Sequence, residues 1–343
     1  MPIVGLDLGS NNFRAVELER KKNGFVVTKF GEYENPKLNL QSEEAGDLDI
    51  YSTALKDFFS ETGFNTPEVV VSLNEVHVYM RNITLPKMGD SELKNSIAYE
   101  AEQYIPLPVS EVNLSYQTLD TDVVEEGKMS VQLVAAKKAI LDKYVGILKK
   151  AKMVPRAIEP ETLALGRVLG DSKEMPMGTI ILDMGFKRTL IIIAYYGFVR
   201  FTRNLAVGGD VITRAIQQGL NLDYNQADEY KKVYGMDQNQ VEGKIYEVAK
   251  PIVDNIITEV RRASLFFTKQ NPGANMKRVI LAGGTAQMPG ILSYMAANLD
   301  LEVELANPFR NLEISPKIEN QRAVLMEKGP IFSTPVGLAL KEV

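Results

Sequence analysis

One short pattern occurs twice in the sequence, about half a chain apart. Leu6-Asp7-Leu8-Gly9 ends an apolar stretch near the N-terminus, and Leu182-Asp183-Met184-Gly185 ends a second apolar stretch. Each stretch is typical of a buried strand, and each glycine favours a turn into another strand. A pattern repeated over so long an interval indicates an internal duplication. The repeat therefore predicts an α/β protein with two related halves, in which Asp7 and Asp183 face each other.

Composition and charge exclude several kinds of site. The 343 residues are enough for two or more subdomains, and a net charge of −5 with no long basic block argues against a nucleic acid partner. The absence of cysteine removes disulfides, thiolate metal sites and cysteine nucleophiles. The only histidine, His77, lies in the alternating segment Val76-His77-Val78-Tyr79 and is predicted to be a strand residue without a catalytic role.

The hydropathy pattern predicts no membrane segment. The longest apolar run, residues 190–196, is far too short to cross a bilayer, and an acidic residue follows the N-terminus too soon for a signal peptide. We therefore expect a soluble, cytoplasmic chain. Any attachment to a membrane must then come through a partner.

The first turn of the repeat has the residue types of a phosphate site. Small and polar residues there can direct several backbone N–H groups to one point, which binds phosphate without a Walker lysine; they are Gly9, Ser10, Asn11 and Asn12. Asp7 cannot usefully contact phosphate, but it can hold a hydrated Mg²⁺ beside it. Asp183 would face it from the opposite half. Taken alone, the pattern favours an ordinary capped turn.

Two further segments fit a ligand site. Gly283 and Gly284 directly follow an apolar strand, so a flat ring or a phosphate could approach the backbone closely there. The alternative is a tight turn from strand to helix. Glu159 stands just before a predicted helix, where it is either an acid favoured by the helix dipole or a base that positions water. The residues alone leave these alternatives open.

The order of these segments resembles that of the actin-like ATPases. That family has a first phosphate hairpin, a first connecting helix, a second phosphate hairpin, an adenosine turn and a second connecting helix. The corresponding segments here are residues 5–10, 159–168, 182–189, 279–284 and 333–340. The resemblance implies an actin-like ATPase fold of duplicated RNase H-like domains, as in actin, the heat-shock chaperone ATPase domain and the division protein FtsA.

Within that superfamily the sequence is most similar to the PilM family of type IV pilus assembly. The similarity is carried by residues 5–10 with Ala15-Val16-Glu17-Leu18 and, more specifically, by Tyr99-Glu100-Ala101-Glu102-Gln103-Tyr104-Ile105-Pro106-Leu107-Pro108. The second segment lies in an insertion that would correspond to the FtsA-like subdomain 1C. The implied subdomains are 1A (1–85, 153–172 and 330–343), 1C (86–152), 2A (173–216 and 272–329) and 2B (217–271).

The resemblance also implies a site for ATP and Mg²⁺. Asp7 and Asp183 would hold the cation through water, and Glu159 would orient an attacking water in a reaction that is slow at most. The other residues implied to contact the nucleotide are Gly9, Ser10, Asn11, Asn12, Gly185, Thr189, Gly208, Gly209, Asp210, Glu229, Lys232, Gly283 and Gly284. Phe186-Lys187-Arg188 is bulkier and more basic than expected in the second turn, where Lys187 or Arg188 could supply charge.

A protein partner follows from the same resemblance. PilM proteins bind the cytoplasmic N-terminal segment of the membrane protein PilN in a groove between subdomains 1A and 1C. The resemblance implies the same partner here, contacts between copies of the chain, and a place at the inner membrane through partners. Tyr104, Ile105 and Leu107 are the expected groove residues. The alternative is that they belong only to the core of the insertion.

Two other functions are consistent with the same fold. One is an FtsA-like cell-division or cytoskeletal filament protein, which would carry a basic amphipathic tail for lipid, and we see no such tail. The other is a sugar or acetate kinase of the same superfamily, which would need a catalytic aspartate in the cleft. We see no further acidic motif suited to that role.

Overall fold

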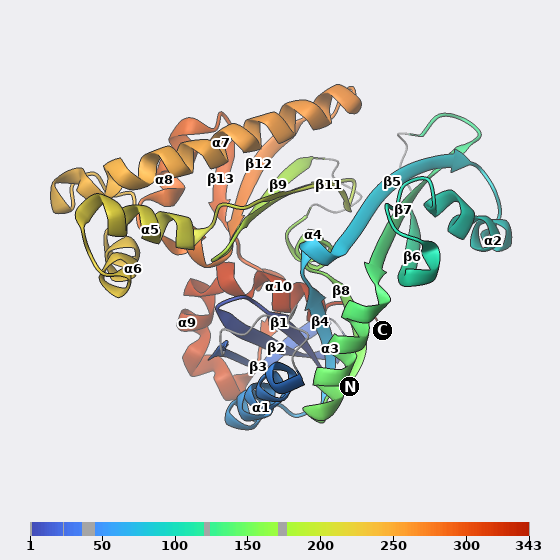
Figure 1. Cartoon of the computed structure of the whole chain (residues 1–343), viewed down its shortest axis with the longest axis horizontal. Coiled ribbons are helices and arrows are strands. Elements are labelled where there is room, and N and C mark those ends of the chain that lie inside the picture. Colours follow the sequence, from blue (N-terminus) through green and yellow to red (C-terminus); the bar gives the residue numbers. More distant parts are fainter. Residues whose placement is uncertain (1, 23, 36–44, 120–123, 171–176, 343) are drawn as a thin grey trace.

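Three β-sheets organise the chain. The computed structural model describes residues 2–22, 24–35, 45–119, 124–170 and 177–342, and these form sheets of six, five and three strands. Figure 1 shows the six-stranded sheet in the lower lobe, the five-stranded sheet above it and the three-stranded sheet to one side. We call these parts lobe one, lobe two and the inserted subdomain.

Lobe one is built on the strand order β14-β3-β2-β1-β4-β8. Its strands are β1 (Pro2–Leu8), β2 (Asn12–Lys21), β3 (Gly24–Glu34), β4 (Glu68–Leu73), β8 (Val154–Pro160) and β14 (Glu313–Ile314). Val4 and Leu6 of β1 pack on one face with α1 (Ala45–Thr62) and α3 (Lys138–Lys150). Gly5 turns to the other face, where an added Cβ would lie 1.9 Å from the backbone oxygen of Pro335. Its lack of a side chain therefore lets α10 (Gly329–Ala339) lie directly on the sheet.

Lobe two repeats the same strand arrangement. Its strands are β9 (Gly178–Met184), β10 (Thr189–Tyr195), β11 (Phe198–Leu205), β12 (Met276–Ala282) and β13 (Glu302–Leu305), in the order β11-β10-β9-β12-β13. In both lobes three antiparallel strands follow one another, and the next strand of the sheet pairs parallel with the first: β4 with β1, and β12 with β9. This common topology confirms the predicted α/β duplication.

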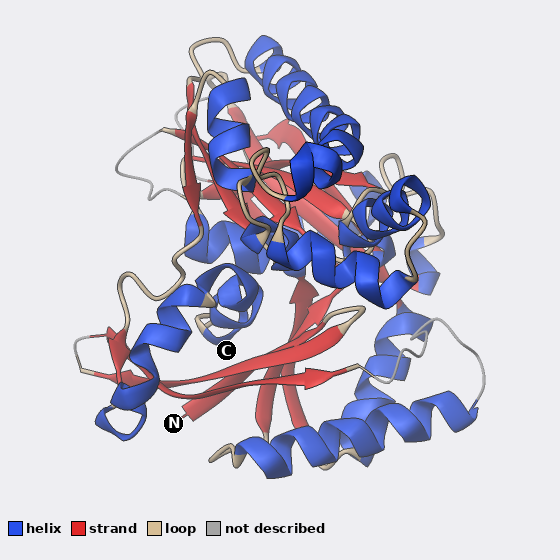
Figure 2. Ribbon diagram, turned by 90° about the vertical axis from the view of Figure 1, so that its left-hand side faces the viewer, coloured by secondary structure: helices blue, strands red, loops and turns tan. Residues whose placement is uncertain are grey.

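Helices cover both faces of lobe two. One face packs against α5 (Gly209–Leu220), α6 (Tyr224–Val233), α7 (Lys244–Gln270) and α8 (Ile291–Asn298). The other face packs against Leu165 and Leu169 of α4 (Glu161–Leu169), which follows β8 of lobe one. Because α10 packs against both α4 and β1, these two helices lie between the sheets and join the lobes (Figure 2).

The inserted subdomain has its own small core. Its strands are β5 (Val78–Pro86), β6 (Val112–Leu119) and β7 (Lys128–Lys137), in the order β5-β7-β6, and α2 (Asp90–Ala101) packs on them. The sheet thus begins before residue 86, where the sequence placed the boundary, and α3 packs with α1 in lobe one. The predicted boundary at 172/173 lies outside the described residues.

Two local predictions differ from the structure. His77 is not in a strand: it ends a short 3-10 turn, Glu75–His77, that leads into β5. The turn forms because the side chain of Asn74 accepts a hydrogen bond from the backbone N–H of Val76. The sequence pattern also predicts a helix over residues 90–104, but α2 ends at Ala101, ahead of Pro106.

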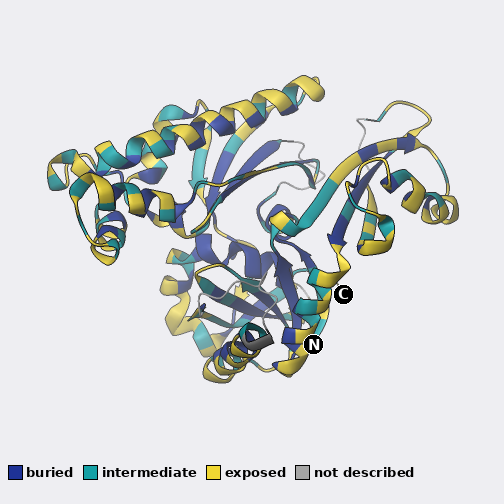
Figure 3. Ribbon diagram, viewed as in Figure 1, coloured by how far each residue is buried: buried dark blue, intermediate teal, exposed yellow. Residues whose placement is uncertain are grey.

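Burial follows the layers of the fold. Figure 3 shows buried residues along the central strands and the two connecting helices, and exposed residues on the outer helices such as α7. Across the residues that the structure describes, no helix combines the length and the apolar character needed to cross a membrane.

Candidate functional site

The two aspartates of the repeat stand at the ends of matching strands. Asp7 lies near the end of β1 and Asp183 near the end of β9. Ser72 of β4 donates a hydrogen bond from Oγ to Oδ1 of Asp7 at 2.7 Å, and Leu8 N donates to Ser72 Oγ at 3.1 Å. Asp7 is therefore held in place by lobe one itself. Burial raises the pKa of Asp183, and the charges of Glu161 and then of Asp7 add to this rise, so the charge of Asp7 acts on Asp183 across the lobes.

A third carboxylate, Glu161, joins this pair. Glu161 is the first residue of α4 and is buried. Its Oε1 accepts hydrogen bonds from Arg188 Nη2 at 2.7 Å and from the backbone N–H of Glu75 at 2.8 Å. Arg188 belongs to the second turn, which connects β9 and β10. The basic side chain noted in that turn therefore points to an acid at the junction of the lobes.

Glu75 extends this network to lobe two. Its carboxylate accepts hydrogen bonds from Thr162 of α4 at 2.9 Å and from Thr202 of β11 at 3.0 Å. Glu75 lies in the turn that leads into β5 of the inserted subdomain. A chain of hydrogen bonds thus runs from the second turn of lobe two to the base of the inserted subdomain.

Burial and mutual repulsion raise the pKa values of these acids. Loss of hydration is the main cause for Asp183, whose pKa rises to about 7, and the charges of Glu161 and Asp7 add to it. Loss of hydration also raises the pKa of Glu75 to about 7, against the hydrogen bond from Thr162, with Glu161 adding repulsion. Burial likewise raises the pKa values of Asp7 and Glu161. Arg188 opposes all four shifts, so the cluster has more acidic groups than nearby cations.

The structure does not bring Glu159 to this cluster. Its two carboxylate oxygens accept hydrogen bonds from Arg167 at 2.6 and 3.0 Å and from Lys341 at 2.8 Å. These cations neutralise a buried acid within lobe one. Glu161, two residues later, is the acid whose charge acts on Asp7 and Asp183. Sequence analysis missed it, although the same Glu-Pro-Glu segment contains both residues.

The first turn leaves polar groups open to solvent. Ser10 and Asn11 are exposed, and the side chain of Asn11 donates to Oδ1 of Asn12 at 2.8 Å. Asn35 Nδ2 holds the carbonyl of Gly9 at 2.7 Å, and an added Cβ at Gly9 would lie 2.7 Å from the backbone oxygen of Asn12. The turn is therefore held by Asn35 and by close backbone packing, and Ser10 and Asn11 face solvent.

The second turn meets the start of α5. Gly209 N donates to the carbonyl of Gly185 at 3.0 Å, and Asp210 N donates to that of Phe186 at 2.9 Å. An added Cβ at Gly208 would lie 2.5 Å from the backbone nitrogen of Arg188, so this contact requires glycine. Thr189, by contrast, is fully buried and donates its hydroxyl to Val207 O at 2.7 Å. Thr189 is therefore not accessible to a nucleotide, contrary to the prediction.

Asp210 lies at the first turn of α5. It accepts hydrogen bonds from Tyr224 at 2.7 Å and from Arg214 at 3.0 Å. Partial burial tends to raise the pKa of Asp210, but these two donors outweigh burial and hold the pKa below its usual value. Asp210 therefore stays ionised at neutral pH.

On α6 the inward pair lies one residue before the predicted one. Glu229 and Lys232 are both exposed. Lys231 is buried, and its Nζ donates to Asp228 Oδ1 at 2.6 Å, to Thr213 Oγ1 at 2.7 Å and to Gly209 O at 3.4 Å. Because one residue turns a helix by about 100°, a shift of one position moves a side chain from the outer to the inner face. Asp228 and Lys231 are thus the pair that faces α5, whereas Glu229 and Lys232 face outward.

The glycine pair after β12 faces the same region. Gly283 has φ +82°, and an added Cβ there would lie 2.5 Å from Oδ1 of Asp183. Thr285 donates its hydroxyl to the carbonyl of Gly185 at 3.0 Å, which ties this turn to the second one. An added Cβ at Gly284 would meet no protein atom within 4 Å, so open space lies beside it. This turn and the second turn of lobe two therefore meet beside Asp183.

The predicted partner residues have different surroundings. Ile105 is only 5% exposed and packs in the core of the inserted subdomain, and Leu107 is half-buried against that core. Tyr104 is 40% exposed. The alternative of a core role therefore holds for Ile105, which is not accessible to a partner, and Tyr104 alone has substantial exposed surface.

The two lobes, the connecting helices and the converging turns define the actin-like ATPase fold. EutJ, the ethanolamine utilization protein from Carboxydothermus hydrogenoformans, covers 99% of this chain and 89% of its own, with 14% identity and a TM-score of 0.57. MreB 5 of Spiroplasma citri, solved with bound AMPPNP, covers 89% of this chain and 91% of its own, with 15% identity and a TM-score of 0.52. At these identities the likeness shows the fold alone.

The comparison with family models is more specific than the comparison of folds. The model of the family described as type IV pilus assembly protein PilM matches residues 5–343, so the chain belongs to this family. The structure of a PilM-PilN type IV pilus biogenesis complex covers 98% of this chain and 97% of its own, with 26% identity and a TM-score of 0.84. Cell division protein FtsA of Bacillus subtilis (strain 168) is 22% identical over 353 residues, which span 89% of this chain and 78% of FtsA.

Proposed function

We propose that this protein is an ATP-binding component of the type IV pilus inner-membrane assembly platform. It works on the cytoplasmic side and binds the N-terminal cytoplasmic segment of a PilN-like membrane protein, which holds it at the membrane. The observation that carries this proposal is the likeness to the PilM-PilN complex over 98% of the chain. That structure is described as a PilM-PilN complex, which supports the kind of partner that we propose here.

The converging turns support a nucleotide between the lobes. Ser10 and Asn11 are exposed at the first turn, and the space beside Gly284 would accept a flat ring. Lys231 lies close to Gly209, at the start of α5. The fold neighbour MreB 5 was solved with AMPPNP, an ATP analogue. ATP is therefore the ligand that we expect between the two sets of turns.

The charge of the site suits a divalent cation. The cluster of Asp7, Glu75, Glu161 and Asp183 has Arg188 and Arg14 as its nearby cations. Within the described ranges, no three acidic side chains are grouped as a direct metal site. Mg²⁺ usually keeps several waters and uses one or two carboxylates. Asp7 and Asp183 would hold it through water, and the cation would neutralise phosphate charge.

Glu161 replaces Glu159 as the acid that we propose to act at the nucleotide. Both oxygens of Glu159 are neutralised by Arg167 and Lys341, whereas Glu161 shares Arg188 with the acid cluster. The raised pKa of Glu161 makes it a better proton acceptor than an ordinary glutamate. Glu161 would orient water, Arg188 would meet phosphate charge, and turnover would be slow at most.

The inserted subdomain connects the proposed nucleotide site with the proposed peptide site. Gln132 of β7 donates to the carbonyl of Val199 at 2.7 Å, and Asn82 of β5 donates to that of Arg200 at 3.0 Å. Both carbonyls belong to β11, an edge strand of the sheet in lobe two. Movement of lobe two around a nucleotide would therefore also displace the inserted subdomain. A peptide that prefers one arrangement would change the ATP affinity by the same factor as ATP changes the peptide affinity.

Calorimetry of the whole chain tests the nucleotide site. We expect ATP with Mg²⁺ to bind the wild type, and Asp7→Ala to weaken Mg²⁺-dependent binding at least about tenfold while the chain stays folded. Asp300→Ala, at an exposed acid on lobe two, is the control and should bind normally. Glu161→Gln should change the affinity or the turnover, and Glu159→Gln should change neither. Equal ATP binding by Asp7→Ala and the wild type would remove the proposed metal role.

The partner is tested with a peptide that copies the N-terminal segment of the PilN-like protein encoded in the same genome. Tyr104→Ser should weaken its binding, and Leu265→Ser, at an exposed leucine on α7, should not. Ile105 is unsuitable for this test because its replacement would disturb the core of the inserted subdomain. ATP binding without peptide binding would return the FtsA-like filament role and the sugar or acetate kinase to consideration.

A further inference from the structure

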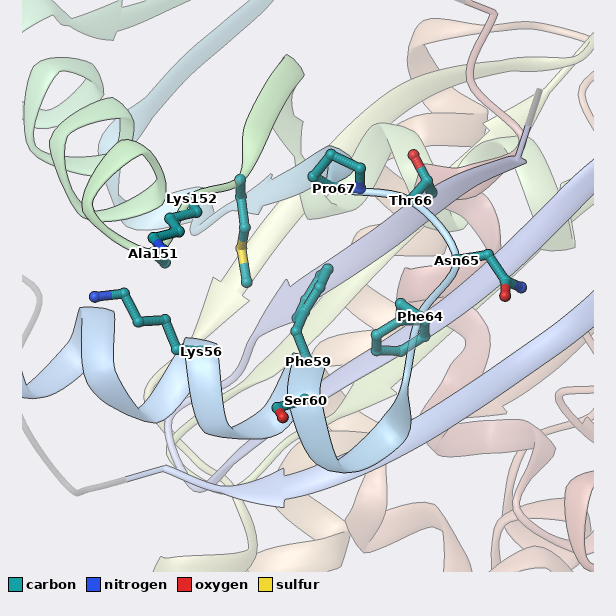
Figure 4. Close-up of a pocket in the computed structure, with 10 residues that line it drawn as sticks. Lys56, Phe59, Ser60, Phe64, Asn65, Thr66, Pro67, Ala151 and Lys152 are labelled. Carbon is teal, nitrogen blue, oxygen red and sulfur yellow. The ribbon is translucent and has the colours of Figure 1, made fainter.

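A separate pocket opens on lobe one. It has a volume of about 300 Å³ and lies between the second half of α1, the loop at residues 63–67 and the turn at residues 151–153. Its apolar floor contains Phe59, Phe64 and Met153, and the two phenylalanine rings have their centroids 4.7 Å apart (Figure 4). None of the residues proposed for nucleotide or peptide binding lines this pocket. It is therefore a distinct surface feature.

Two lysines stand at its edge. Lys56 of α1 and Lys152 after α3 are exposed and lie on the same side of the pocket in Figure 4, with Asn65 and Thr66 on the other side. Neither lysine forms an ion pair with any described part of the chain, although neighbouring Lys150 pairs with Asp49. Lys152 also has φ +62°, a conformation that usually favours glycine at a helix end. In a chain of net charge −5, this is an apolar pocket with two free cations.

Helix α2 of the inserted subdomain carries a surface of opposite charge to the lysines of the pocket. Leu93, Ile97 and Ala101 face its core, whereas Tyr99 is 71% exposed. Glu92 lies seven residues before Tyr99 and Glu102 three residues after it, so all three side chains lie along one exposed face. This face presents a large aromatic ring between two carboxylates.

We propose that α2 of one copy docks into the lobe-one pocket of the next copy. Tyr99 would pack onto the touching rings of Phe59 and Phe64, while Glu92 and Glu102 meet Lys56 and Lys152. In Figure 1, α2 lies at the tip of the inserted subdomain, well away from α1 at the base of lobe one. The same chain therefore does not fill its own pocket, and the contact joins copies head to tail.

The contact is small and partly electrostatic, so it should be weak in dilute solution. It should become important when several copies are held close together, because a raised local concentration favours weak contacts. Salt should weaken it by screening the four charges. The proposal does not depend on nucleotide or peptide binding.

Reversing the charges on the pocket and on α2 tests the proposed contact. Sedimentation velocity of the whole chain at rising concentration and low salt, with and without ATP and Mg²⁺, should show reversible self-association. Lys56→Glu with Lys152→Glu should abolish it, and so should Glu92→Lys with Glu102→Lys. An equimolar mixture of these two double variants should associate again, because the unaltered α2 of the first variant meets the unaltered pocket of the second, and the two altered surfaces also carry opposite charges. Tyr99→Ser should also prevent association.

Controls separate this contact from general charge effects. Lys269→Glu with Lys277→Glu changes the net charge by the same amount as Lys56→Glu with Lys152→Glu. Because both positions are exposed on lobe two, this variant should leave association unchanged. Unchanged thermal unfolding would show that the variants are folded. A wild type that stays monomeric under both conditions would overturn the proposal. A mixture that fails to associate would overturn it too, and the pocket would then belong to a different partner.

Discussion

Arg188 Nη2 donates to Glu161 Oε1 at 2.7 Å, and this bond joins the second turn of lobe two to the start of α4. The same oxygen accepts the backbone N–H of Glu75 at 2.8 Å. A single carboxylate oxygen therefore fixes three segments: the second turn, the connecting helix and the base of the inserted subdomain. A change at the second turn cannot occur without affecting the other two.

Arg188→Ala should destabilise the protein by about 2–3 kcal/mol, because it leaves Glu161 buried without its cation. The loss should be smaller at pH 5 than at pH 7, since a protonated Glu161 needs no cation. Adding Glu161→Gln to Arg188→Ala should recover part of the loss. Urea unfolding of the two single variants and the double variant gives these values, and strictly additive losses would contradict the pairing.

The pKa of Glu75, raised to about 7 from an ordinary value of 4.5, predicts a dependence of stability on pH. Between these values the folded state holds a proton that the unfolded state releases. The resulting stabilisation is complete below about pH 4.5 and is lost as the pH rises through about 7. Between pH 5 and 7 the wild type should lose up to about 1.4 kcal/mol per pH unit more than Glu75→Gln. Urea unfolding at several pH values measures this difference. If the free energy of unfolding depends on pH in the same way in both proteins, the raised pKa is excluded.

Lys231→Met should lower the free energy of unfolding by about 1–3 kcal/mol, because it removes hydrogen bonds from the buried Thr213 and from Asp228. Lys232→Met is the matched control. Lys232 pairs with Asp228 from an exposed position, so its replacement should cost less than about 0.5 kcal/mol. Urea unfolding distinguishes the two positions, and equal losses would mean that the buried contacts of Lys231 add nothing.

Gln132→Leu should loosen the inserted subdomain from lobe two. The fully buried Gln132 donates to Val199 O and to Asn82 Oδ1, and its removal should cost about 1–3 kcal/mol. Hydrogen exchange in β5 and β7 should become faster. Gln117→Leu is the control. Gln117 is exposed, and among the described residues its side chain forms a hydrogen bond only with Gln132. Equally fast exchange in both variants would show that the bond to β11 is not the anchor.

Much of the fold could be predicted because its signals are local. Apolar runs that end in Asp7-Leu8-Gly9 and Asp183-Met184-Gly185 indicated matching strands, and the sheets confirm them. Asp7 and Asp183 also lie near the ends of strands, and Gly283 directly follows one, as predicted. The errors concern orientation: His77 was predicted to be in a strand but lies in a turn, and Thr189 faces the interior.

The sequence by itself determined the duplication, the order of the turns and the insertion, because residue type and spacing set strands, glycine turns and apolar faces. Only the tertiary structure decided that Glu161 rather than Glu159 meets Arg188 of the second turn, and that Lys231 rather than Lys232 turns inward. The physical reason is that one or two residues along a strand end or helix change which face a side chain occupies. Which face lies near the other lobe depends on how the two halves pack, and no local pattern contains that information.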